Sequence, residues 1–184
     1  ALDFAVTEAR DAERVLRLGE LDIPAIAAML ARYGLTLRVV ADGESIPGSF
    51  WGECEAGLIK DEVYVRSDTP LHSLLHESCH YICMTPDRRA GLDTDAGGDH
   101  LEECGVCYLQ VLLADEVGRG GRERSFRDMD DWGYSFRLGS TREWFEQDAE
   151  DARLWLLDEG LIGGDGLPTW LLRQRQLLRS DAIA

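Results

Sequence analysis

The stretch Leu71-His72-Ser73-Leu74-Leu75-His76-Glu77-Ser78-Cys79-His80 contains the pattern His-Glu-x-x-His, and most of the chain can be interpreted around it. On an α-helix, residues four apart lie one turn apart on the same face, so His76 and His80 can direct ring nitrogens at one ion. Two neutral imidazoles suit Zn²⁺. Glu77 lies about 100° round the helix from His76, where it can take a proton from water without being a ligand. The spacing therefore predicts a helical zinc site with Glu77 as general base.

The side chains around the pattern decide whether it is a site or a coincidence on a solvated helix. They make the segment largely apolar, and they are Leu71, Leu74, Leu75, Tyr81 and Ile82. A buried helix seldom carries unpaired histidine and glutamate. We therefore expect a buried helix whose polar residues meet at a metal ion.

A catalytic zinc needs a third protein ligand, which must come from another segment. The helix expected over residues 101–117 offers Glu103, Glu102 and, just before it, His100. We favour Glu103, because the helix face around it carries small or modest side chains that would let the two helices approach closely. Glu102 and His100 remain alternatives. His72 lies about 12 Å from His80 along the motif helix, too far for one ion to bind both, and is expected to line the site or to pack.

The chain has five cysteines, an odd number that does not suggest a secreted disulfide framework. We expect mostly free thiols in a reducing compartment. Cys79 and Cys83 form one close pair and Cys104 and Cys107 another, which raises a rival four-thiolate structural zinc site. Both pairs lie within expected helices and lack the glycine-rich turns that normally present such ligands, so we favour packing.

Composition limits the classes of partner. The 184 residues carry 19 Lys and Arg against 35 Asp and Glu, a formal charge of −16 that disfavours direct binding to nucleic acid or anionic membranes. No apolar run has membrane-spanning length, and Ala1-Leu2-Asp3-Phe4 lacks the basic start of a signal peptide, so a cytoplasmic protein is expected. A single domain over residues 1–184 is the default, with a core over about 22–117 and a helical extension over 118–184.

Periodicity along the chain predicts an α+β fold. Helices are expected over residues 7–19, 22–34, 70–84, 101–117, 140–159 and 168–179, and strands over 36–40, 58–60 and 62–66, with a further possible strand over 49–53. Residues 87–98 are expected to be a loop, and residues 118–139 a break followed by a linker. The strands would form a small, mostly antiparallel or mixed three-stranded sheet packed on the motif helix and the ligand helix.

His76-Glu77-Ser78-Cys79-His80, followed roughly two dozen residues later by Glu103 on the next helix, resembles the gluzincins. Together with Glu102-Glu103-Cys104-Gly105-Val106-Cys107-Tyr108, the compact arrangement over about residues 22–117 resembles the minigluzincin and ImmA/IrrE group of small metallopeptidases. The family usually has a small residue where Cys79 stands and asparagine where Gly105 stands. The resemblance implies a zincin-like fold, His76, His80 and Glu103 as zinc ligands, Glu77 as general base, and a peptide or protein substrate.

These features predict a zinc-dependent hydrolase, a metallopeptidase whose substrate runs along residues 62–66 as an edge strand. Tyr134 and His100 are the first candidates for a donor to the developing oxyanion, with Tyr64 and Tyr108 behind them. The alternative is a catalytically silent, protease-like zinc protein that acts as an interaction or regulatory module through its acidic surface or its C-terminal helix. A metalloenzyme acting on a non-peptide amide would use the same residues.

Overall fold

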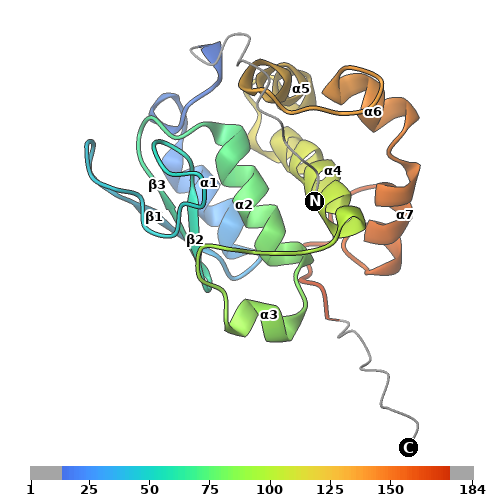
Figure 1. The fold of residues 1–184 in the computed structure, drawn as a ribbon, viewed down its shortest axis with the longest axis horizontal. Helices are drawn as coiled ribbons and strands as arrows, with labels where there is room; N and C mark the ends of the chain where they lie inside the picture. Colours follow the sequence, from blue (N-terminus) through green and yellow to red (C-terminus); the bar gives the residue numbers. More distant parts are fainter. Residues whose placement is uncertain (1–13, 175–184) are drawn as a thin grey trace, which may run out of the picture.

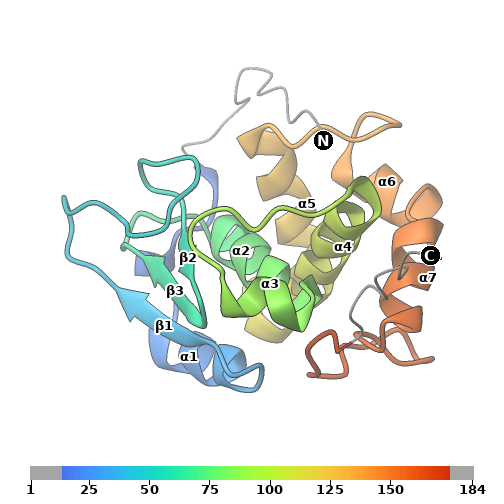
Figure 2. The ribbon, with the colours of Figure 1, turned by 60° about the horizontal axis from the view of Figure 1, so that its bottom comes forward.

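The computed structural model describes residues 14–174, which contain seven α-helices and one three-stranded sheet (Figure 1). The fold is therefore α+β, as predicted. Figure 2 shows α2 (Leu71–Cys83) between the sheet on one side and α4 (His100–Val117) on the other. No helix in the described part of the chain is long and apolar enough to cross a membrane.

The sheet consists of β1 (Thr36–Val39), β2 (Gly57–Ile59) and β3 (Glu62–Val65), in the order β1-β3-β2. β1 runs parallel to β3 and β2 antiparallel to it, so the sheet is mixed. β3 is the central strand, and the prediction that residues 62–66 form an edge strand for the substrate is wrong. Alternation of side chains identifies a strand, but it does not tell which strands lie beside it.

The outer edge of β2 is also occupied. The amide of Leu58 donates to the carbonyl of Gly48 at 3.1 Å, and its carbonyl accepts from the amide of Thr94 at 2.9 Å. Residues 49–53 form only an isolated bridge between Ser49 and Gly57, so the further strand expected there is wrong. Gly48 and Gly52 have φ of 72° and 79°, which turns the chain out of an extended conformation.

α2 is buried along almost its whole length, and it packs on β2, β3 and α4. Its polar residues His72, Glu77 and His80 are buried with the apolar ones. Pro70 is the residue before α2, so the helix starts one residue later than the one expected over residues 70–84. The burial of α2 fixes the direction of every side chain of the motif.

Two other predicted helices of the core are confirmed and one segment is not. α1 (Ile23–Ala31) is capped by Asp22, whose carboxylate accepts from the amide of Ala25, and it packs on β1. Asp99 precedes α4 and caps it in the same way. Most of the helix expected over 7–19 lies outside the described residues, and the described remainder contains only the 3₁₀ turn Leu18–Glu20.

The second half of the chain departs most from the predictions. α3 (Pro86–Ala90) lies in the expected loop, and α5 (Gly121–Trp132) occupies the expected break and linker. Instead of one helix over 140–159 there are two, α6 (Thr141–Gln147) and α7 (Glu150–Asp158). Residues 168–174 form no helix, and the rest of the segment predicted over 168–179 lies outside the described residues.

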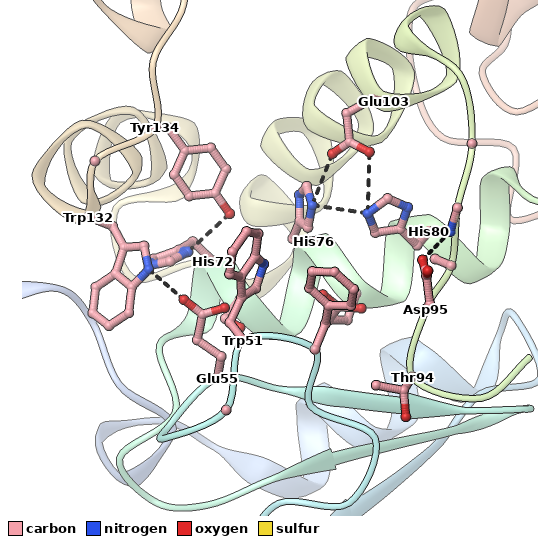
Figure 3. A pocket seen from close by; sticks show the side chains of 18 of the residues that line it. Trp51, Glu55, His72, His76, His80, Thr94, Asp95, Glu103, Trp132 and Tyr134 are labelled. Atoms are coloured by element: carbon pink, nitrogen blue, oxygen red, sulfur yellow. Dashed lines mark hydrogen bonds and ion pairs between the residues drawn. The ribbon is translucent and has the colours of Figure 1, made fainter. Parts of the chain in front are cut away.

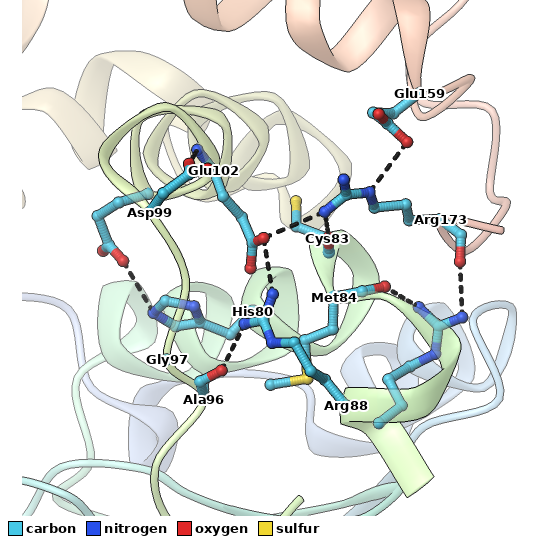
Figure 4. Close-up of polar contacts among 12 residues, drawn as sticks. His80, Cys83, Met84, Arg88, Ala96, Gly97, Asp99, Glu102, Glu159 and Arg173 are labelled. Atoms are coloured by element: carbon cyan, nitrogen blue, oxygen red, sulfur yellow. Dashed lines mark hydrogen bonds and ion pairs between the residues drawn. The ribbon is translucent and has the colours of Figure 1, made fainter. Parts of the chain in front are cut away.

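Residues 168–174 are fixed to the core by Arg173, which is 6% exposed. Its guanidinium donates to Glu102 of α4 at 3.1 Å and to Glu159 at 2.9 Å (Figure 4). Its amide donates to the carbonyl of Ile82 at 3.0 Å. Arg88 also donates to Glu102, at 2.8 Å, and to the carbonyl of Ala96. Glu102 thus joins α4, α3 and the chain beyond α7.

Candidate metal centre

Three side chains from two helices converge on one point, as the sequence predicts. His76 and His80 of α2 lie with their Nε2 atoms 3.1 Å apart, and Glu103 of α4 lies opposite them (Figure 3). A carboxylate oxygen of Glu103 is 3.2 Å from the Nε2 atom of His76, and the other is 3.6 Å from that of His80. Among the described residues, these three make up the one group of His, Cys, Asp or Glu side chains suited to holding a metal ion.

The spacing of these donor atoms fits a zinc ion. Donors held about 2.0–2.1 Å from a tetrahedral ion lie roughly 3.3 Å from one another. The two Nε2 atoms are 3.1 Å apart, and they lie 3.2 and 3.6 Å from the two different oxygens of Glu103, which is close to this value. Two imidazole nitrogens and one carboxylate oxygen also form a usual donor set of catalytic zinc, which leaves a fourth position open.

Gln110 lies about two helical turns after Glu103 on α4, and it orients the ring of His76. The Nδ1 atom of His76 is 2.8 Å from the side-chain oxygen of Gln110, whose amide nitrogen donates to the carbonyl of His72 at 3.3 Å. Because the amide oxygen only accepts, Nδ1 of His76 donates to it, and Nε2 is the nitrogen that would present a lone pair to a bound ion. Gln110 belongs to the face of small or modest side chains around Glu103, and its polarity inside an apolar run was the available signal for its role.

The charges of the three groups are coupled. Burial alone would raise the pKa of Glu103, but its hydrogen bond with His76 and the two imidazoles lower it to about 2. Burial and the neighbouring charge of His76 lower the pKa of His80 to about 4. Two facing imidazole nitrogens cannot both carry protons, so the pair offers a lone pair and the carboxylate a negative charge to a bound cation.

Glu77 lies beside this group, is 8% exposed and lines the same cavity. Burial raises its pKa to about 7, with the carboxylates of Glu55 and Glu103 adding to the effect and His76 opposing it. A carboxylate that titrates near neutral pH is suited to accept and return a proton. Glu77 is not among the three side chains that could hold a metal ion.

The donor atoms open onto a cavity of about 700 Å³. Its walls are residues 50–55 before β2, residues 94–100 before and at the start of α4, the buried side of α2, and Trp132 to Tyr134 at the C-terminal end of α5. A small molecule, or a side chain of a peptide, fits in such a volume. The strand residues 62–66 do not line it, which follows from the central place of β3.

Of the four residues considered as oxyanion donors, the structure brings two to the cavity. Tyr134 lies with its hydroxyl 3.3 Å from Nδ1 of His72, and its ring is 5.9 Å from the ring of His76. His100 lines the opening. Tyr64 instead donates to Glu62 at 2.6 Å, and Tyr108 stacks on Phe145 at 4.3 Å. Neither lines the cavity.

The alternatives for the third ligand lie elsewhere. Glu102 points away from the two histidines and is bound by two arginines. His100 is exposed, with its ring 3.7 Å from the thiol of Cys104. The four thiols of the rival site form no metal-binding group in the described part of the chain. Burial raises the pKa of Cys79, Cys83 and Cys107, which keeps these thiols protonated.

Comparison of the chain with protein-family models, with curated proteins and with solved structures gives no match.

Proposed function

We propose that this protein is a zinc-dependent metallopeptidase of zincin-like fold, with His76, His80 and Glu103 as ligands and Glu77 as general base. The observation that carries the proposal is the convergence of two Nε2 atoms and a carboxylate at 3.1–3.6 Å on the wall of an open cavity. A small mixed sheet, the motif helix packed on it and a following ligand helix support the zincin-like assignment.

The residues of the chain divide the chemistry between them. A bound Zn²⁺ would supply a Lewis acid that polarises a carbonyl and makes water a better nucleophile. Glu77 accepts a proton from the attacking water and returns it to the leaving amine, for which a pKa of about 7 is suitable. Gln110 holds the ring of His76 in the tautomer that a ligand requires. Tyr134 is the best-placed donor to the developing oxyanion.

Catalysis is favoured over a purely structural ion by the surroundings of the site. A structural zinc usually has four protein ligands and is closed, whereas this group has three and faces a cavity. Burying a carboxylate without a positively charged partner costs free energy, and a role in proton transfer would account for such a carboxylate next to the ligands. Glu77 is such a carboxylate.

The test is Glu77→Gln, compared with Glu53→Gln, which removes an exposed carboxylate from the wall of the same cavity. Zinc content and hydrolysis of a mixed peptide library are measured for each. Both variants should bind one zinc per chain, and Glu77→Gln should cleave peptides at least 100-fold more slowly, the usual contribution of a general base. Full activity of Glu77→Gln would contradict the proposal. Zinc binding without hydrolysis in the unsubstituted protein would favour the silent interaction module.

A further inference from the structure

We propose that the cavity beside the metal centre binds a basic side chain of the substrate, preferably arginine, with Glu55 as its counter-charge. The inference rests on the proposed peptidase function, and it adds a substrate class to it. Glu55 lies on the loop before β2, outside the three ligands and the general base, and its side chain faces the cavity (Figure 3).

The carboxylate of Glu55 is fixed in place at one oxygen only. Nε1 of Trp132 donates to it at 2.9 Å, and this is the one hydrogen bond of the carboxylate within residues 14–174. The ring of Trp132 is in turn held against His72, with centroids 5.1 Å apart. The second oxygen of Glu55 is therefore presented by a rigid support and is available to a ligand.

Charge in the cavity is strongly one-sided. Six carboxylates line it, and among the described residues no lysine or arginine does; the six are Glu53, Glu55, Glu77, Asp95, Asp99 and Glu103. A zinc ion would balance Glu103 and its neighbour Glu77, but Glu55 belongs to neither role. Burial of His72 lowers its pKa to about 3, so this ring adds no positive charge beside Glu55. A half-buried carboxylate without a cation is costly, and a cationic ligand relieves that cost.

Aromatic rings complete the pocket and favour a guanidinium. Trp51 is 60% exposed and Phe50 is 53% exposed, and both line the cavity opening four to five residues before Glu55. Their rings meet edge to face at 5.1 Å, and the exposure of Trp51 leaves much of its indole accessible to a ligand. A planar guanidinium stacks on an indole and binds a carboxylate through two N–H groups, which an ammonium cannot do. Arginine should therefore bind better than lysine.

Binding is tested without turnover in the zinc-loaded Glu77→Gln protein. The probes are Nα-acetyl-arginine amide and its neutral isostere Nα-acetyl-citrulline amide. The affinity of each probe is measured by calorimetry. Arginine should bind about 10- to 100-fold more tightly than citrulline, as expected for a charged hydrogen bond. Adding Glu55→Gln should abolish this difference. The glutamine keeps an acceptor for Trp132, so the loop is expected to stay folded.

Two further variants separate this explanation from others. Glu53→Gln removes the same charge from the same loop at an exposed position, and it should change the preference less than about 3-fold, because exposed ion pairs contribute little. Trp51→Ala should weaken arginine binding by about 2- to 30-fold. Equal binding of the two probes, or an unchanged preference in Glu55→Gln, would refute the pocket. Alanine amide with a free amine shows whether an α-amino group is the preferred cation, which would refute the side-chain assignment.

Hydrolysis supplies the second arm. The unsubstituted enzyme should cleave peptides with arginine beside the scissile bond faster than matched citrulline peptides, and Glu55→Gln should cleave the two peptides at similar rates. An equal loss of rate on both peptides would mean that Glu55 positions the reacting groups, contrary to the proposal. If no peptide is cleaved but the binding preference depends on Glu55, the peptidase function fails and the basic-ligand pocket stands.

Discussion

Glu102 and Glu103 are adjacent carboxylates at the start of α4, and their surroundings are opposite. Glu103 faces two imidazoles, at 3.2 and 3.6 Å. Glu102 faces two guanidinium groups, with Arg88 at 2.8 Å and Arg173 at 3.1 Å (Figure 4). The side chain of Glu103 is 18% exposed and that of Glu102 is 6% exposed, so both are largely shielded from solvent. Successive helix residues point about 100° apart, which is enough to send the two carboxylates to different sides of α4.

The comparison shows how the partner decides the role of a buried carboxylate. Arginine carries a permanent charge, so Glu102 is neutralised within the fold and joins three segments. The two facing Nε2 atoms of the histidines carry at most one proton between them, so a cation can complete the group that they form with Glu103. One carboxylate is therefore paired within the fold and the other belongs to a group that could hold a metal ion, although the two are neighbours in the sequence.

Glu103→Ala should have the largest effect. Loss of a ligand should weaken zinc binding by more than about 100-fold, because loss of a mere supporting residue already costs 10- to 100-fold. Hydrolysis should fall below detection. Zinc affinity is measured by competition with a chelator. Glu102→Ala is the matched control, and it should retain zinc; a greater loss of zinc in Glu102→Ala than in Glu103→Ala would reverse the assignment.

Glu102→Ala should instead lower the free energy of unfolding of the zinc-free protein by about 3 kcal/mol. The value lies at the lower end for a broken buried ion pair, because Arg173 keeps Glu159. Urea denaturation measures it. Glu116→Ala, at an exposed position of the same helix, should leave stability nearly unchanged. Equal stability of the two variants would show that the arginines do not depend on Glu102.

The part of the site that lies within one helix or on one helix face could be predicted from the sequence. The four-residue spacing of His76 and His80 fixes their common direction wherever the helix lies, and the small residues around Glu103 indicated the face that meets α2. The contacts of Glu55 and Gln110 could not be predicted. They join residues 77 and 34 positions apart, and no local pattern reports such contacts.

The incorrect predictions of the fold have the same physical origin. α5 buries Ser125 and Asp128 beside Phe126 and Met129, so its inner face does not look apolar in the sequence. Asp128 can be buried because it accepts from the amide of Leu16, 112 residues away. Near Trp170 the sequence pattern predicts a helix that the structure lacks, and Trp170 has a φ of 63°. Tertiary contacts override local preference at both places.

Gln110 offers a smaller and more selective change on the Glu103 side of α4. Gln110→Leu should weaken zinc binding by about 10- to 100-fold, since the ring of His76 loses the acceptor that fixes its tautomer. Gln110→Glu keeps an acceptor and should remain within a few-fold of the original affinity. Chelator competition and thermal unfolding without zinc distinguish a metal effect from a general loss of structure. Equal zinc affinities of the two variants would show that Gln110 does not support the metal ligands.

Gly105→Ala probes the Glu102 side of α4 and should have the smallest effect. A methyl group at this position would lie 2.6 Å from two ring carbons of Trp155, so the indole of α7 must move. That ring lies 5.0 Å from the guanidinium carbon of Arg173, and its movement therefore disturbs the partner of Glu102. Overpacking usually costs about 1–3 kcal/mol, and the better helix propensity of alanine offsets about 1 kcal/mol of it. We expect a net loss of stability near 1 kcal/mol, measured by urea denaturation, and an unchanged zinc affinity, which would show that the two sides of α4 are independent. A parallel loss of zinc affinity would show that the two sides are coupled through the helix.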